Sequence, residues 1–368
     1  MARTMTDPLR ETPSGLPRAR AFDLPFEGVP GASNAITDVA GLEVGYTTLI
    51  EGEALRSGVT AILPRGKAGM ATPCWSGIFS LNGNGEMTGS HWIEETGTCE
   101  LAVTITNTHA VGVARDATIK WAARNLAFGD GLDWGLPVAA ETFDGHLNDI
   151  NGFHVTEAHV FAAIESAQGG PVEEGSVGGG TGMICYGFKG GSGTASRMAG
   201  GYTLGAFVQA NFGRPRELTV AGVPVGRELE GGFDYGAGYG AGSGSIIGVL
   251  ATDAPLLPHQ LKRLARRAGL GIGRSGAIAH HGSGDIFLAL STGNPEALNA
   301  TQGPAQASFL PDESLDFLFE AAIQAVDEAI LNALFANREM TGRNGHRIAA
   351  LPREQVRALL AAAGRIAG

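Results

Sequence analysis

The sequence predicts a mixed α/β or α+β chain in which strands alternate with long helices. Several runs of β-branched and apolar residues are bounded by polar or turn-forming residues, which is typical of strands. Other segments repeat their apolar residues every three to four positions, as amphipathic helices do. The 368-residue chain is 43% hydrophobic, so it can bury a large core in one large domain or two ordinary ones.

The N-terminal segment, 1–30, is predicted to be a tail ahead of a single domain, 31–368. Its first twenty residues carry three prolines and no apolar periodicity, which is typical of a mobile segment or of a strap on a partner subunit. The strands expected after it, each a β-branched or apolar run, lie within 36–50 and at 58–64, 101–108, 245–251 and 285–292.

Four helices are expected between and after these strands. Residues 114–126 place Ala117, Trp121 and Ala122 near helical spacing. A second helix starts at Pro258, because proline suits a first helical turn. The third spans 315–334, where apolar residues recur every three to four positions, and a short helix follows Pro352.

Glycine is the most unusual feature of the composition. The chain has 57 glycines, concentrated in the segments 176–196 and 231–245, and we expect neither segment to pack a core. Their glycines follow no three-residue period, which excludes collagen. Neither a P-loop nor a strand-borne dinucleotide-binding motif is present.

Charge and cysteine content exclude further classes. The chain has 26 basic and 37 acidic residues, a net charge of −11, and a field of that sign repels phosphate backbones, which argues against a nucleic-acid partner. Three scattered cysteines favour reduced, buried thiols over a disulfide framework. Because no apolar signal segment or membrane span is visible, a cytoplasmic protein with no membrane partner is expected.

The junction between the second glycine-rich segment and the strand at 245–251 carries the chemistry. A hydroxyl on the first residue of that strand, Ser245, could attack the carbonyl before it, and Gly244 permits strain and close approach. An N-to-O acyl shift followed by hydrolysis would cut the chain. The new Ser245 would then hold both a nucleophilic hydroxyl and an α-amine with an unperturbed pKa of about 7.7–8.0, suited to a general base.

A second pair of polar residues opens the strand at 285–292. Ser283 and Asp285 are two residues apart, so their side chains share one face of an extended chain. A hydroxyl bonded to a carboxylate can orient a neighbouring nucleophile. A glycine loop that merely enters a strand remains the alternative reading of the junction at Ser245.

Seven segments carry a resemblance to a known family. They are NAITDVAGLEVGYTTLI, GVTAILP, ITNTHAVG, PVAAETFDGHLNDING, VQANFG, GSIIGVLATDAPLLPHQLKRLARRAGLG and GSGDIFLALST. They resemble the P1 family of N-terminal nucleophile aminopeptidases, which includes the L-aminopeptidase D-Ala-esterase/amidase and the β-peptidyl aminopeptidases. The resemblance covers nearly the whole chain after the tail. It implies a four-layer αββα sandwich, self-cleavage into chains 1–244 and 245–368, and αβ heterodimers assembled into a homo-oligomer such as a tetramer of heterodimers.

The resemblance also implies roles for single residues. Ser245 matches the nucleophile, and Ser283 and Asp285 match the residues that accompany it. Asn211 matches an asparagine that donates to the oxyanion, a role that suits a neutral amide. Glu141 matches a glutamate near the amino end of the substrate, where a carboxylate would hold a free ammonium.

One position departs from the pattern of some relatives. Phe143 stands where they have a tyrosine whose hydroxyl helps the oxyanion, and loss of one such donor can cost on the order of 10²–10³ in turnover. The expected function is a self-processing serine aminopeptidase acting on short peptides, amides or esters without metal or organic cofactor. Two alternatives stay open: an acyltransferase using the same acyl-serine, and an uncleaved binding protein of the same fold. Ser243 also follows a glycine, so it is a second possible cleavage position.

Overall fold

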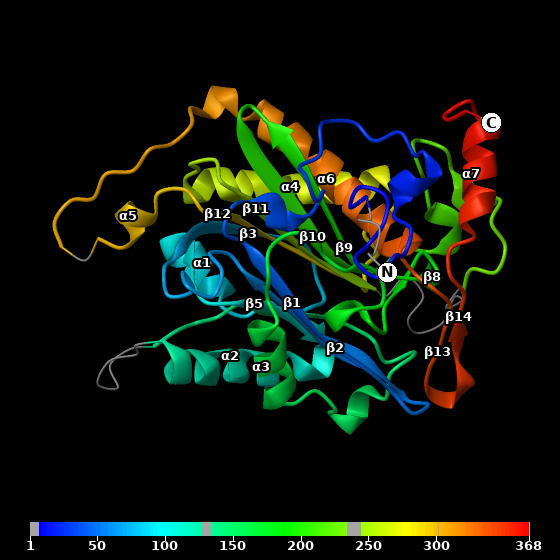
Figure 1. The fold of residues 1–368 in the computed structure, drawn as a ribbon, viewed down its shortest axis with the longest axis horizontal. Coiled ribbons are helices and arrows are strands. Elements are labelled where there is room, and N and C mark those ends of the chain that lie inside the picture. Colours follow the sequence, from blue (N-terminus) through cyan, green and yellow to red (C-terminus); the bar gives the residue numbers. More distant parts are fainter. Residues whose placement is uncertain (1–6, 127–133, 234–243, 301, 368) are drawn as a thin grey trace, which may run out of the picture.

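The computed structural model describes residues 7–126, 134–233, 244–300 and 302–367 as four layers, helices, sheet, sheet and helices (Figure 1). The four-stranded sheet has the order β1-β2-β5-β6 and the six-stranded sheet the order β4-β3-β12-β11-β10-β9. The predicted αββα sandwich is confirmed. The strands of the first sheet are β1 (Glu43–Glu51), β2 (Leu55–Leu63), β5 (Val103–Asn107) and β6 (Ala139–Thr142). Those of the second are β3 (Cys74–Gly83), β4 (Thr98–Cys99), β9 (Gly191–Ala199), β10 (Tyr202–Asn211), β11 (Ser245–Thr252) and β12 (Gly284–Ser291).

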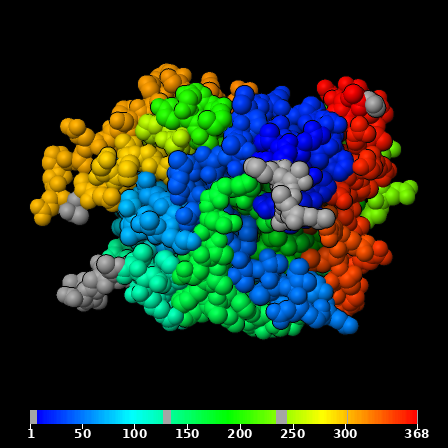
Figure 2. Space-filling model, viewed as in Figure 1, coloured from blue at the N-terminus to red at the C-terminus, as the bar shows by residue number. Residues whose placement is uncertain are grey.

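Helices cover the outer face of each sheet. Helices α4 (Pro258–Arg274) and α6 (Asp316–Phe335) pack on the six-stranded sheet, and α2 (Val111–Asn125) and α3 (Glu157–Glu165) pack on the four-stranded sheet (Figure 1). The remaining helices are α1 (Ser90–Thr96), α5 (Pro295–Leu298) and α7 (Arg353–Ala362), and two short hairpins pair β7 (Ile184–Cys185) with β8 (Phe188–Lys189) and β13 (Met340–Thr341) with β14 (Arg347–Ile348). The segment that carries α5 stands out from the body (Figure 2). No helix among the described residues is long and apolar enough to cross a membrane.

Three apolar layers explain the uninterrupted apolar run of β11. Ile246 and Leu250 face the helices α4 and α6, whereas Ile247 and Val249 face the layer between the two sheets. Successive side chains of a strand point to opposite faces. A strand that is buried on both faces is therefore apolar at nearly every position. The third layer lies between the four-stranded sheet and α2 and α3, around Trp121.

Most of the expected elements are confirmed, with shifted ends. The strand expected within 36–50 starts only at Glu43. Before it, the carboxylate of Asp38 accepts backbone N–H bonds from Ser33 (2.9 Å) and Ala35 (3.1 Å) and holds the chain in a turn. Helices expected at 114–126, from Pro258 and at 315–334 are α2, α4 and α6.

The expectation that the glycine-rich segment 176–196 cannot pack a core is wrong. Every residue from Gly178 to Arg197 is buried, and the segment forms β9 beneath α6. A Cβ at Gly193 would overlap the carbonyl oxygen of Ala329 and lie 2.9 Å from the Cβ of Ala333. Glycine is present because the helix backbone lies directly against this strand. The other glycine-rich segment falls largely outside the described residues.

Part of the expected tail is bound to the body. Arg18 is 3% exposed and donates to the carboxylate of Glu174 at 2.7 Å. Buried Glu328 on α6 accepts hydrogen bonds from Arg20 (2.6 Å), Asn34 (2.6 Å) and Arg197 (2.7 Å). The division of the chain at residue 30 stays a prediction.

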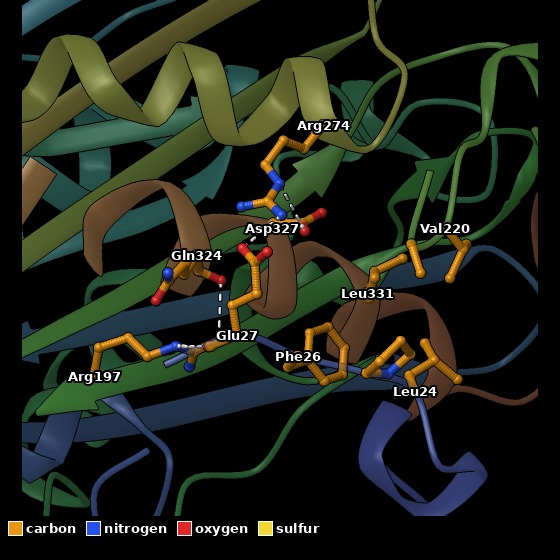
Figure 3. A pocket seen from close by; sticks show the side chains of 11 residues that line it. Leu24, Phe26, Glu27, Arg197, Val220, Arg274, Gln324, Asp327 and Leu331 are labelled. Carbon is orange, nitrogen blue, oxygen red and sulfur yellow. Dashed lines mark hydrogen bonds and ion pairs between the residues drawn. The ribbon is translucent and has the colours of Figure 1, made fainter. Parts of the chain in front are cut away.

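Side chains of this N-terminal segment and α6 also line a small cavity (Figure 3). Two residues of the cavity lining form an ion pair: the Arg274 guanidinium donates to the Glu27 carboxylate at 2.9 Å. The volume of this cavity is about 30 Å³, far below the roughly 300–1,000 Å³ of ordinary small-molecule sites.

The close approach at Gly193 yields a first prediction. Gly193→Ala should lower the free energy of unfolding by about 1–3 kcal/mol, because the added methyl group overpacks the contact with α6. Gly112→Ala is the matched control: a Cβ on Gly112, in α2, would meet nothing within 4 Å, and alanine favours a helix. Urea unfolding of both variants checks this, and an equally small effect of the two substitutions would contradict it.

Buried Lys189 yields a second prediction. Its ammonium donates to the carbonyls of Met183 (2.8 Å) and Gly190 (2.7 Å), and burial lowers its pKa to about 7. The unfolded chain keeps this proton up to about pH 10.4, so the free energy of unfolding should rise between about pH 7 and 10 by up to about 1.4 kcal/mol per unit. Lys189→Met should remove that contribution. Urea unfolding at several pH values measures the slope, and equal slopes for both proteins would refute the prediction.

Candidate active site

Three strand ends meet at one edge of the six-stranded sheet. Strand β10 ends at Asn211, directly opposite Ser245, the first residue of β11. On its other side, β11 runs parallel to β12 and pairs Ser245 with Gly284. The side chains of Asn211, Ser245, Ser283 and Asp285 are all at most 4% exposed. The structure thus brings together four of the residues selected from the sequence.

Ser283 and Asp285 are joined as the spacing predicts. The Ser283 hydroxyl donates to Oδ1 of Asp285 at 2.6 Å. Burial raises the pKa of Asp285, while bonds from Ser283, Asn82 and the backbone N–H of Ile246 favour its charged form. Since Ile246 follows Ser245, this carboxylate is tied directly to the strand that carries the serine.

Two asparagines at the end of β3 hold the turn that carries Ser283. The amide of Asn82 donates to the carbonyls of Ala279 (2.8 Å) and His280 (2.9 Å) and lies 3.4 Å from Oδ2 of Asp285. The amide of Asn84 donates to the carbonyl of Gly282 at 2.7 Å. Sequence reasoning missed both residues, and the repeated N-G-N-G at 82–85 is the only local signal that could have indicated them.

The side-chain amide of Asn211 is held at both ends. Its Oδ1 accepts the backbone N–H of Ile184 at 2.8 Å, and its Nδ2 donates to the carbonyl of Phe143 at 3.0 Å. These bonds fix the orientation of the amide on the residue that pairs with Ser245. An amide nitrogen carries two hydrogens, so one remains for a further acceptor.

Glu141 reaches the same region from the other sheet. It lies on β6, is 3% exposed, and accepts hydrogen bonds from the Thr108 hydroxyl and from the backbone N–H of Glu86 (3.0 Å). Gly85 lies between Glu141 and the start of β12. A Cβ added at Gly85 would lie 3.2 Å from the Glu141 carboxylate and 3.4 Å from Cα of Gly284. Burial raises the pKa of Glu141, and the two hydrogen bonds oppose that rise.

Phe143, two residues beyond Glu141, is 49% exposed. Its side chain offers no hydrogen-bond donor, and its backbone carbonyl accepts the hydrogen bond from the Asn211 amide. The donor expected from the tyrosine of some relatives is therefore missing here.

The peptide bond before Ser245 is tightly enclosed. The carbonyl oxygen of Gly244 accepts the backbone N–H of Gly284 at 3.1 Å. A Cβ on Gly244 would overlap the carbonyl of Asn211 and lie 2.7 Å from Cα of Phe212, so only glycine fits. The alternative position, Ser243, lies outside the described residues.

A cavity of about 540 Å³ adjoins this site. Ile78, Met87 and Ile286 form apolar parts of its wall, and Gly85, beside the Glu141 carboxylate, lines it as well. Its size is that of an ordinary small-molecule site. The cavity of Figure 3 shares none of these residues.

The chain is similar to known peptidases over almost its whole length. The model of peptidase family S58 matches residues 34–348. The chain is 50% identical to the β-peptidyl aminopeptidase BapA of Sphingosinicella microcystinivorans, over 95% of this chain and 93% of that protein.

Two solved structures share the fold over almost their full length. The L-aminopeptidase D-Ala-esterase/amidase of Ochrobactrum anthropi, described as a variant of the Ntn hydrolase fold, superposes with a TM-score of 0.90 at 49% identity, covering 95% of this chain and 99% of that one. A β-aminopeptidase from a Burkholderia species gives 0.86 at 45% identity, with 94% and 99% coverage. The resemblance seen in the sequence is confirmed: the chain belongs to peptidase family S58 and is an aminopeptidase of the N-terminal nucleophile hydrolase fold.

Proposed function

We propose that the chain cuts itself between Gly244 and Ser245, and that the freed Ser245 is the nucleophile of the aminopeptidase. One observation carries this proposal: the carbonyl before Ser245 is already held by a backbone N–H, that of Gly284, at 3.1 Å. A donor placed on a carbonyl oxygen stabilises the oxyanion that forms when a nucleophile attacks.

In the cut, the Ser245 Oγ attacks the carbonyl carbon of Gly244 and the Gly284 N–H holds the oxyanion. The C–N bond breaks, the Ser245 nitrogen takes the proton of the hydroxyl, and an ester joins the two residues. Water hydrolyses this ester and leaves a carboxylate on Gly244. The products are chains 1–244 and 245–368.

In the aminopeptidase reaction, the Ser245 Oγ attacks the substrate carbonyl and the α-amine of the same residue accepts the proton. The remaining hydrogen of the Asn211 amide donates to the oxyanion. The Ser283–Asp285 pair orients the serine through its strand. The amine then protonates the leaving group, and water releases the acyl group from the serine.

Glu141 restricts the reaction to N-terminal residues. Its buried carboxylate would bind the free ammonium of the substrate in a charge-assisted hydrogen bond, and the adjoining cavity would receive the first side chain. We propose short peptides, amides or esters as substrates. Because Phe143 replaces the tyrosine of some relatives, Asn211 and backbone N–H groups stabilise the oxyanion.

The assembly and the cellular location follow from the resemblance and the charge. We propose αβ heterodimers that assemble into a homo-oligomer in the cytoplasm, without a nucleic-acid or membrane partner. The net charge of −11 supports the exclusion of nucleic acid.

The cut is tested by the mass of the purified protein under denaturing conditions. The wild-type protein should give two chains, one beginning Ser-Ile-Ile-Gly-Val, because Ser245 supplies the attacking hydroxyl. Ser245→Ala should give one inactive chain of 37.8 kDa. Ser243→Ala, the matched control, should be cut as the wild type is. Cleavage of Ser245→Ala would refute the assignment of the attacking hydroxyl, and an intact wild-type chain would refute the proposed cut.

The role of Glu141 is tested by Glu141→Gln, which keeps the shape and removes the charge. We expect kcat/KM for substrates with a free amino terminus to fall about 10- to 100-fold, the value of a hydrogen bond to a charged group. Glu53→Gln, at an exposed position beside β1, is the control. Steady-state kinetics measure the loss, and unchanged kcat/KM in a correctly cut Glu141→Gln variant would rule the role out.

A further inference from the structure

A buried glutamine bridges the two sheets directly beneath the site. Gln209, on β10, is fully buried in the layer between the sheets, where it lies opposite Ile247 of β11. Burying an amide among apolar side chains is unfavourable unless its hydrogen bonds are satisfied. A polar side chain at this position therefore calls for a reason beyond packing.

Both side-chain hydrogen bonds of Gln209 cross to the other sheet. Its Nε2 donates to the carbonyl of Thr106 on β5 at 2.9 Å and to the hydroxyl of Thr142 on β6 at 2.7 Å. The Thr106 carbonyl can only accept, so the nitrogen of the amide must point toward it. Its Oε1 is buried and receives no hydrogen bond from the described residues.

These bonds belong to a closed circuit of contacts that includes Asn211, the proposed oxyanion donor. The Thr142 hydroxyl also contacts the sulfur of Met183 at 2.8 Å. The residue after Met183 is Ile184, whose backbone N–H holds Oδ1 of Asn211, while Nδ2 of Asn211 holds the carbonyl of Phe143. The circuit closes because Gln209 and Asn211 are two residues apart on one face of β10.

Thr142 lies between Glu141 and Phe143, so Gln209 links the strand that carries the amine-binding carboxylate to the strand that carries Asn211. The distance between these two groups sets how many carbons separate the ammonium from the reacting carbonyl. An α-amino acid has one such carbon and a β-amino acid has two.

We propose that Gln209 is a positioning residue that fixes the spacing between Glu141 and Asn211, and that this spacing sets the preference between α- and β-amino acyl substrates. The inference rests on the proposed roles of Glu141 and Asn211. It assigns Gln209 no contact with the substrate.

The test compares kcat/KM for β-alanine p-nitroanilide and L-alanine p-nitroanilide, after intact mass has shown the state of the cut. The wild-type protein should discriminate between the two. Gln209→Met removes the hydrogen bonds at similar side-chain length. We expect the ratio of the two constants to move toward unity by about tenfold or more, the low end of what one carbon contributes to specificity.

A second pair of variants keeps the test valid if Gln209→Met fails to fold. Thr142→Val removes the hydroxyl that Gln209 binds and should shift the ratio in the same direction. Thr142→Ser retains the hydroxyl and should keep the wild-type ratio. Phe207→Leu is the control, because Phe207 is buried on the same strand and face, two residues farther from the site. A merely structural role would lower both constants together and leave the ratio unchanged.

Three outcomes overturn the inference: a wild-type enzyme that hydrolyses both substrates equally, an unchanged ratio in active Gln209→Met and Thr142→Val, or an equal shift in Phe207→Leu. Loss of the cut in both hydrogen-bond variants also overturns it, because the bridge would then serve maturation. A wild-type protein inactive on both substrates would instead refute the proposed function.

Discussion

The two backbone pairings of β11 hold the site together. Antiparallel pairing with β10 sets Asn211 opposite Ser245, and parallel pairing with β12 sets Gly284 beside it. A shift of either register by one residue would turn every side chain of that strand to the opposite face. The apolar residues of β11 prevent such a shift, because they fill two different core layers. The packing of the sandwich thus maintains the geometry of the reaction.

The sequence indicated those parts of the site that depend on neighbours along the chain. Ser245 stands out because it starts an apolar strand after a glycine segment, and Ser283 and Asp285 are two residues apart. Asn211 and Glu141 were identified only through the resemblance, since neither has a local pattern. Asn82 was missed because its contact with Asp285 joins residues 203 positions apart. Such contacts depend on which strands pair, and composition does not determine that.

The error over residues 176–196 has a physical origin. Glycine lowers the intrinsic preference for a strand and provides no side chain to pack, so a glycine-rich segment suggests a surface loop. In this protein the missing side chains let other backbones approach: α6 lies against β9 at Gly193, and β10 encloses the peptide bond of Gly244. Whether a glycine is a flexible joint or a close contact depends on the element that covers it.

The hydrogen bonds and ion pairs to Glu328 would join two separate chains after the proposed cut. Arg20, Asn34 and Arg197 precede the proposed cut, whereas their partner Glu328 follows it. If the chain is cut as proposed, the enzyme would be an obligate heterodimer whose subunits share one core. Its refolding would be bimolecular and would depend on protein concentration, unlike that of the precursor. Unfolding of the mature enzyme would be practically irreversible when dilute, so its lifetime would be set by an unfolding rate.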